Sequence, residues 1–366
     1  MTPTVDIRIA DVVTNLKAVS ALTAARGIGL TVVTKALVGY RPVVERLVDA
    51  GATSIAEARV ETLRAYADLP VERWLIRSPL MSQIDDTVRF ADVSLNSEVC
   101  VIEALGRAAL RQGGTHKVVI MVELGDRREG VMPDDAVDVC LRAASVPGIE
   151  LLGVGTEFGC YSHVVPSAPA LEQLASLVGA VENSLGRPLQ VVSGGASNAL
   201  HMLLEGTLPS AVNHLRVGDS ILTGRVADYT TPIPGACPDP FTLRAEIIEI
   251  KSKPSKPVGL RVPGDVPVAD DPHFPDLGVR RRALMAVGKQ DVDIRHLTPC
   301  DPRITIQEGS SDAFVVDLTD CGDEYSVGDE LAFVMDYFSI LPSMVSGFVD
   351  KVILTESGSH SVSPPS

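Results

Sequence analysis

The sequence predicts an α/β protein in which a (β/α)8 TIM-like barrel is followed by a smaller C-terminal antiparallel β domain. Short apolar runs alternate with amphipathic helical stretches from residue 5 to about residue 225, and this alternation is typical of a closed parallel barrel. After Gly235 the pattern changes to short alternating runs separated by Gly, Pro and Asp, which indicates an antiparallel sheet. An open, doubly wound sheet is the alternative arrangement for the first part of the chain.

The predicted barrel strands are short runs of apolar and β-branched residues. The clearest is 118–122, which is apolar throughout, as a strand buried on both faces should be. Helical stretches such as 42–50 and 58–66 separate the runs. In chain order the eight runs are 31–34, 54–56, 74–76, 93–95, 118–122, 151–154, 189–192 and 214–217.

Three segments follow from these patterns: a barrel domain over residues 1–235, a β domain over 236–355 and a tail over 356–366. The tail is rich in Ser and Pro, so we expect it to be disordered. Residues 323–330 are predicted to form a turn before the last of the main β runs. The runs of the β domain are 241–250, 283–287, 313–318 and 331–334.

Composition narrows the class of protein. With 366 residues and 45% hydrophobic residues the chain can bury a large core. The net charge of −15 argues against a nucleic-acid partner, whose phosphates need Lys and Arg. The sequence has no stretch of roughly 18 apolar residues that could cross a membrane and no apolar signal region at its start. The six cysteines form no C-x-x-C pair, so we expect free thiols and a cytoplasmic protein.

Polar residues end the predicted strands, and barrel enzymes carry their chemistry at these carboxyl ends. Lys35 is the most unusual of them, because an unpaired ammonium is costly to bury. Either its stem reaches out to the barrel rim, or its amine bonds covalently to a carbonyl compound. The strand-end residues are Lys35, Glu57, Arg77, Asn96, Glu123, Glu157, Ser193 and Arg216.

Two loops favour a phosphate site. Residues 193–198 follow the seventh strand and residues 216–220 follow the eighth, where barrels frequently bind phosphate. Their glycines let backbone N–H groups approach an anion, and their hydroxyls add donors. Tight turns use the same residues, so the position of the loops carries the argument. A lysine at one strand end and phosphate binding at two others predict a pocket for pyridoxal 5′-phosphate.

Taken together, these segments resemble the alanine racemase-like, fold-type III enzymes that use pyridoxal phosphate, and most closely the ornithine racemase branch. The resemblance covers about residues 5–350. The segments that carry it are 5–9 with Asn15, 33–35, 122–130, 193–198, 215–218, 248–255, 286–291 and 310–317.

The resemblance implies roles for individual residues. Lys35 would hold the cofactor and serve as one of two acid/base groups, and Arg128 would be the active-site arginine. Arg216 would face the pyridine nitrogen, where a permanently charged guanidinium leaves the ring largely unprotonated and the cofactor a weaker electron sink. Decarboxylases of this fold type have a glutamate there. The other cofactor-binding residues implied are Ser193, Ser197, Asn198, Gly218 and Asp219.

The chain departs from alanine racemases at several positions. Met121 stands where those enzymes carry a modified lysine. Gly155 and Glu157 replace a tyrosine and a histidine, and Glu157 could pair with Arg216 or form a salt bridge elsewhere on the rim. Lys289 takes the position of the tyrosine that acts on the second face. The candidates for the second acid/base are therefore Lys289, Asp312, Cys160 and Tyr161.

The resemblance implies racemisation of an amino acid, and of a basic one such as ornithine or lysine. Glu57, Glu157 and Asp291 are candidates to bind a distal ammonium. The family forms head-to-tail homodimers that combine one barrel with the partner's β domain, so Lys289 and Asp312 would act across that interface.

Two alternatives remain at this point. One is a decarboxylase of basic amino acids on the same fold. The other is a non-catalytic, pyridoxal phosphate-binding homeostasis protein, although such proteins resemble the barrel alone and this chain continues well beyond Gly235. His163 and His201 lack ligand spacing, so we expect no metal site.

Overall fold

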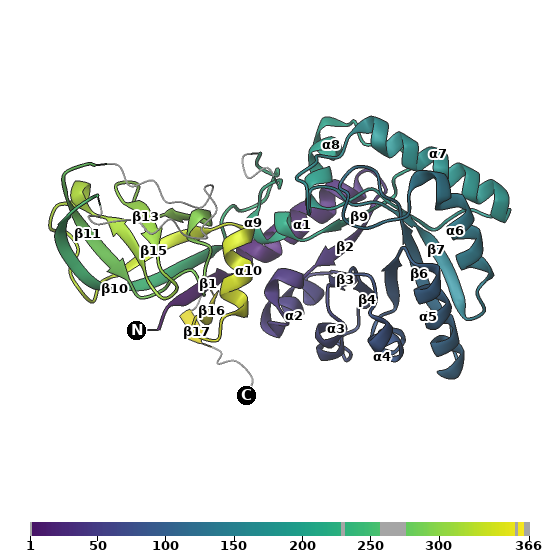
Figure 1. Ribbon diagram of the computed structural model, residues 1–366, viewed down its shortest axis with the longest axis horizontal. Coiled ribbons are helices and arrows are strands. Elements are labelled where there is room, and N and C mark those ends of the chain that lie inside the picture. Colours follow the sequence, from purple (N-terminus) through teal and green to yellow (C-terminus); the bar gives the residue numbers. More distant parts are fainter. Residues whose placement is uncertain (1, 228–230, 257–275, 356–357, 362–366) are drawn as a thin grey trace, which may run out of the picture. The chain divides into compact units, whose positions relative to one another are not determined.

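The computed structural model describes residues 2–227, 231–256, 276–355 and 358–361 (Figure 1). The chain forms two compact units. One contains Ala10–Pro238, and the other combines Met1–Ile9 with Asp239–Ser366.

The unit Ala10–Pro238 contains a closed barrel of eight parallel strands in sequence order, from β2 round to β9 and back to β2. This confirms the predicted barrel, and the open sheet is wrong because β9 pairs with β2. Each of the eight predicted runs contributes one strand. The strands are β2 (Gly29–Val33), β3 (Ser54–Glu57), β4 (Glu72–Leu75), β5 (Val93–Asn96), β6 (His116–Met121), β7 (Ile149–Gly155), β8 (Val191–Ser193) and β9 (His214–Val217).

Helices connect the strands and surround the barrel (Figure 1). They are amphipathic: α5, for example, buries Ile102, Leu105 and Ala109, whose spacing of three and four residues puts them on one face. The helices are α1 (Ile9–Ala24), α2 (Arg41–Asp49), α3 (Val60–Ala65), α4 (Ile84–Phe90), α5 (Val99–Arg111), α6 (Pro133–Ser145), α7 (Ala168–Leu185), α8 (Leu200–Glu205) and α9 (Asp219–Thr223).

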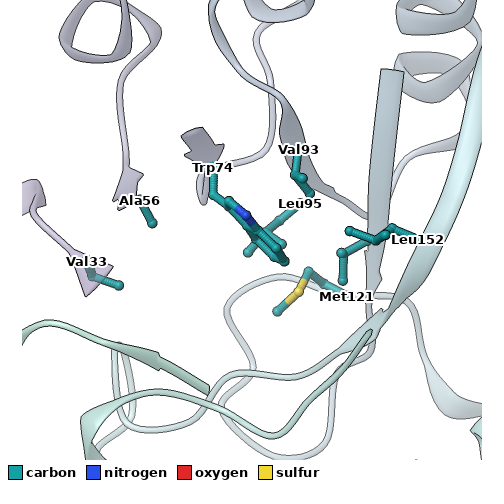
Figure 2. Close-up of a cluster of buried hydrophobic side chains, with 8 residues drawn as sticks. Val33, Ala56, Trp74, Val93, Leu95, Met121 and Leu152 are labelled. Carbon is teal, nitrogen blue, oxygen red and sulfur yellow. The ribbon is translucent and has the colours of Figure 1, made fainter. Parts of the chain in front are cut away.

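Apolar side chains from six successive strands form a buried cluster, as expected for a filled barrel. Figure 2 shows the indole of Trp74 pointing towards Leu95 and Met121. Trp74 is the only tryptophan of the chain and is 2% exposed. The cluster consists of Val33, Ala56, Trp74, Val93, Leu95, Val119, Met121 and Leu152.

The second unit is built on a nine-stranded sheet in the order β13-β14-β11-β10-β1-β16-β17, with β15 pairing with β10 and β12. The predicted β runs lie in β10, β11, β14 and β15, which confirms an antiparallel β domain after the barrel. The elements are β1 (Thr4–Arg8), β10 (Phe241–Pro254), β11 (Val279–Met285), β12 (Leu297–Pro299), β13 (Thr305–Gly309), β14 (Phe314–Asp317), β15 (Glu330–Met335), α10 (Tyr337–Val345), β16 (Asp350–Thr355) and β17 (Gly358–Ser361).

The first strand corrects the predicted division of the chain. Residues 1–235 were expected to form one barrel domain, but β1 belongs to the sheet of the other unit. It pairs antiparallel with β10 and parallel with β16, and Val5 and Ile7 are fully buried. A strand followed by a helix has the same local sequence pattern whether the strand belongs to the barrel or to the sheet of the other unit. Only the long-range pairings decide where β1 lies.

The predicted tail is partly ordered, because β17 pairs with β16, whereas residues 356–357 and 362–366 lie outside the described residues. Among the helices described, none has the length and apolarity to cross a membrane. The described ranges also contain no cluster of His, Cys, Asp and Glu suited to a metal ion. All six cysteines are free thiols.

Candidate active site

The carboxyl ends of the barrel strands bring most of the predicted site residues together. Lys35 follows β2 as the first residue of the short 3-10 helix η1 (Lys35–Leu37), and Arg216 lies in β9. Ser193 ends β8, and Arg128 and Glu157 lie in the loops after β6 and β7. In a parallel barrel all strands point the same way, so these ends share one rim.

Lys35 is half-buried and close to a buried carboxyl group. The hydroxyl of Thr34 donates to Oε1 of Glu57 over 2.6 Å, and Glu57 is 2% exposed. Burial raises the pKa of Glu57 to about 7, against the opposing effects of the Thr34 and Ala58 hydrogen bonds and the positive charge of Lys35. A carboxyl group that titrates near neutrality therefore lies beside the predicted cofactor lysine.

Arg216 is a buried cation held from two sides. It is 1% exposed, so it is not a surface salt-bridge residue. One terminal nitrogen donates to the hydroxyl of Ser193. The other donates to the carbonyl oxygen of Thr156 (2.8 Å) and to Oε2 of Glu157 (2.9 Å). Of the two pairings left open for Glu157, the structure shows the one with Arg216, and it compensates a charge that would be costly to bury alone.

The loops after β8 and β9 have the donors that an anion needs. Ser197, in the 3-10 helix η3 (Ser197–Ala199), accepts from the backbone N–H groups of Gly218 (3.3 Å) and Ser220 (3.2 Å). The hydroxyl protons of Ser197 and Ser220 then have no acceptor among the described residues, although both side chains are buried. Two buried hydroxyls without acceptors fit the oxygens of a bound phosphate.

Gly218 is required by close packing at this point. A Cβ atom there would lie 2.5 Å from the carbonyl oxygen of Val33. The turn from β9 into α9 is thereby pressed against the end of β2, two residues before Lys35. Asp219 begins α9. Asn198 is in η3, and its side-chain nitrogen donates to the carbonyl oxygen of Phe158 over 2.7 Å.

The loops after β6 and β7 are tied together by Asp126, a residue that the sequence did not single out. Its carboxylate accepts from the backbone N–H groups of Gly159, Tyr161 and Ser162 and from the hydroxyl of Ser162. Although burial raises its pKa, these hydrogen bonds hold it below the ordinary value. The role of Asp126 is visible only in the folded structure, where it joins two loops that are far apart in the sequence.

Arg128 pairs with its neighbour Glu129. The thiol of Cys160 lies within range of the charges of Glu157, Lys35 and Arg128. Cys160 therefore belongs to the same rim as Lys35.

Lys289 and Asp312 lie in the other unit. The backbone N–H of Lys289 donates to the carbonyl oxygen of Ser310 (2.9 Å). Asp312 accepts from the hydroxyl of Ser310 (2.8 Å), and the ammonium of Lys289 pairs with Glu308. The two predicted residues are thus on adjoining loops, and their part in catalysis stays a prediction.

Comparison with known proteins agrees with this geometry. The family model described as alanine racemase, N-terminal domain, matches residues 7–225. An ornithine racemase of Acetoanaerobium sticklandii is 33% identical over 97% of this chain and 100% of its own length. A lysine racemase of Thermotoga maritima is 34% identical over 96% of this chain and 98% of its own length.

Solved structures share the fold at low identity. A D-threonine aldolase from Filomicrobium marinum has a TM-score of 0.75 at 17% identity, and the match covers 100% of this chain and 93% of that one. An alanine racemase from Streptomyces lavendulae has a TM-score of 0.75 at 19% identity over 97% of both chains. An alanine racemase from Bartonella henselae with covalently bound pyridoxal phosphate has a TM-score of 0.72 at 16% identity, over 97% of this chain and 100% of that one. The chain belongs to the alanine racemase family.

Proposed function

We propose that this protein is a pyridoxal phosphate-dependent racemase of a basic amino acid, with ornithine or lysine as its substrate. The observation that carries the proposal is the arrangement of one barrel rim. Lys35 follows β2, the buried hydroxyls of Ser197 and Ser220 lie without acceptors after β8 and β9, and the buried Arg216 lies in β9. Two relatives that align over almost the whole chain are named as racemases of ornithine and lysine.

The barrel residues fit the cofactor. Lys35 would bond to its aldehyde carbon, Ser197 and Ser220 with the backbone near Gly218 would hold its phosphate, and Arg216 would face its ring nitrogen. When bound, the cofactor supplies an electron sink that lowers the cost of removing the proton at Cα.

The acid/base work falls to residues of the chain. Lys35 would hold or release the Cα proton on one face. We assign the other face to Lys289, with Asp312 beside it, supplied by the partner in a head-to-tail homodimer. Cys160, which lies near Lys35 and Arg128, and its neighbour Tyr161 are the alternatives within one chain.

The substrate's distal ammonium needs a carboxylate, because a buried ammonium left unpaired costs several kcal/mol. Glu157 is engaged by Arg216, and Asp291 accepts from the hydroxyl of Ser346 (2.6 Å) in the other unit. Glu57 is the remaining candidate, beside Lys35. We place the protein in the cytoplasm, in keeping with its six free thiols.

The test uses Lys35→Ala and, as its control, Lys17→Ala, which changes an exposed lysine on α1. We expect Lys35→Ala to lose the visible absorbance of bound cofactor and all exchange of the Cα proton with D2O, and Lys17→Ala to keep both. Borohydride reduction should fix the cofactor on Lys35, and attachment to another lysine would contradict the assignment.

A substrate panel completes the test. Ornithine, lysine, arginine, alanine and serine are compared by kcat/KM for racemisation in the unmodified protein. We expect ornithine or lysine to be preferred. A preference of about tenfold or more for alanine or serine, about 1.4 kcal/mol in transition-state binding, would reject the basic substrate. Release of carbon dioxide in place of the other enantiomer would instead indicate a decarboxylase.

A further inference from the structure

A line of buried polar side chains runs from Arg216 through the interior of the barrel. The hydroxyl of Ser193, which Arg216 contacts, lies 3.0 Å from Nδ1 of His214. Nε2 of His214 lies 2.9 Å from the hydroxyl of Thr31, which is 2.8 Å from the hydroxyl of Ser54. Ser54 donates to the carbonyl oxygen of Leu30 over 3.1 Å. All the side chains in this line are at most 7% exposed. We call it the barrel relay.

The carbonyl end of the barrel relay fixes the direction of its hydrogen bonds as far as His214. A guanidinium can only donate and a carbonyl oxygen can only accept. Because the single proton of Ser54 goes to the carbonyl oxygen of Leu30, Thr31 must donate to Ser54. His214 must then donate to Thr31 from Nε2.

The other half of the barrel relay follows from the charge of the imidazole. Burial, together with a smaller effect of the charge of Arg216, lowers the pKa of His214 to about 3, so the ring is neutral near pH 7. A neutral ring with its proton on Nε2 presents Nδ1 as an acceptor. Ser193 therefore donates to His214 and turns its lone pairs towards Arg216. In the reverse direction the hydroxyl proton of Ser193 would have no acceptor among the residues described.

The ring of His214 is also held in position by packing. It stacks on the indole of Trp74 with ring centroids 4.8 Å apart and planes 11° apart. Rotation of the imidazole out of this plane would break the stack and both of its hydrogen bonds. His214 is therefore a rigid part of the barrel interior.

We propose that His214, acting through Ser193, is the positioning residue for Arg216. Glu157 and the carbonyl oxygen of Thr156 hold one terminal nitrogen of the guanidinium. The barrel relay holds the other terminal nitrogen through the hydroxyl of Ser193, which is uncharged. Among these contacts of Arg216, Glu157 therefore carries the only negative charge. What Arg216 is positioned towards, the ring nitrogen of the cofactor, rests on the proposed function. The direction of the barrel relay does not.

The first test reads the histidine ring directly. The protein, loaded with pyridoxal phosphate and labelled with 15N at histidine, is examined by NMR from about pH 5 to about pH 9, where an ordinary histidine titrates. His214→Phe, which keeps an aromatic ring against Trp74, assigns the signals. We expect the proton of His214 on Nε2 and an unprotonated Nδ1 throughout. A proton on Nδ1, or titration near the ordinary histidine pKa, would overturn the proposal.

The second test asks whether His214 acts through Ser193. In His214→Phe we expect kcat to fall about tenfold with little change in KM, as is usual for a group that orients another. In a Ser193→Ala background the same change should have little further effect, because the link to Arg216 is already lost. If the two effects multiply instead, His214 does not act through Ser193 and the proposal is wrong.

His116→Phe is the matched control. His116 is also a buried barrel histidine, with Nε2 2.8 Å from the hydroxyl of Ser94, and burial lowers its pKa to about 4. It has no link to Arg216, so kcat should stay within about twofold of the parent. An equal loss of kcat in His116→Phe would show a general effect on the barrel and reject the proposal.

Thr31→Val serves if His214→Phe does not fold. It removes the acceptor at Nε2, so the proton of His214 should shift to Nδ1, and an unchanged ring would overturn the barrel relay. If the unmodified protein racemises nothing, the proposed function fails while the ring measurement still decides the barrel relay.

Discussion

At the scale of single residues, the carboxyl group of Glu57 depends most on its surroundings. It is buried beside Thr34 and Lys35, and its pKa rises from 4.5 to about 7. The unfolded chain loses this proton near the ordinary value, whereas the folded chain keeps it until about pH 7. Between these two pH values the folded state binds more protons, so its stability must fall as pH rises.

Glu57→Gln cannot ionise and should escape this loss. We expect the stability of the variant relative to the parent to increase by roughly 3 kcal/mol between about pH 4.5 and about pH 8. Urea unfolding of the cofactor-free proteins at both pH values measures it. Glu61→Gln is the control, since hydrogen bonds from its own backbone N–H and from Gln83 lower the pKa of this exposed carboxyl. Its effect on stability therefore falls mostly below about pH 4.5, and the relative stability of this variant should change little between the two pH values. If the stability of Glu57→Gln relative to the parent does not change with pH, the pKa of Glu57 is not raised in the folded protein.

At the scale of elements, the turn from β9 into α9 and the end of β2 form one structure. Gly218 permits their contact, and the backbone N–H groups of Gly218 and Ser220 reach Ser197 on η3. The two predicted phosphate loops are therefore joined by hydrogen bonds, and the loop after β9 is packed against the strand that leads to Lys35. A change in this contact should disturb the lysine and the phosphate donors together.

Gly218→Ala tests this packing. The added Cβ would overlap the backbone of Val33, so we expect a loss of about 1–3 kcal/mol in stability and weaker retention of pyridoxal phosphate. Gly179→Ala, within α7, meets nothing within 4 Å and should gain up to about 1 kcal/mol. Denaturant unfolding and cofactor titration measure the two effects. Equal behaviour of the two variants would show that the turn does not need glycine.

At the scale of the whole molecule, the first nine residues belong with residues 239–366 and not with the barrel that follows them in sequence. β1 lies between β10 and β16 in the sheet. The sheet of the second unit therefore needs both ends of the chain. Its folding depends on contacts of very long sequence separation, which are costly to close.

Ile7→Ala should weaken that sheet and spare the barrel. Ile7 is fully buried, and such a truncation costs about 2–5 kcal/mol. We expect hydrogen exchange to accelerate in β10 and β16 and to remain slow in β6 and β7. Val119→Ala, at an equally buried position in the barrel cluster, should give the opposite pattern. Faster exchange in the barrel strands of Ile7→Ala would contradict the division into two units.

The sequence by itself determined the barrel, because each strand is a local apolar run and the runs alternate with amphipathic helices. It also determined which residues gather on one rim: once eight parallel strands close, Lys35, Glu157, Ser193 and Arg216 must share their carboxyl ends. Local pattern and the direction of the strands were sufficient for these predictions.

Only the tertiary structure decided the rest. Strand β1 looks like any strand before a helix, and its place follows from pairing with β10 and β16. The sequence left two possible partners for Glu157, and the short distance between its carboxylate and the guanidinium of Arg216 in the structure decides for Arg216. Thr31, Ser54 and His214 are ordinary strand residues in the sequence, and they form the barrel relay because the strand register turns all three inward. Strand pairing, strand register and side-chain distances depend on residues that are far apart in the chain. A local sequence pattern therefore cannot predict them.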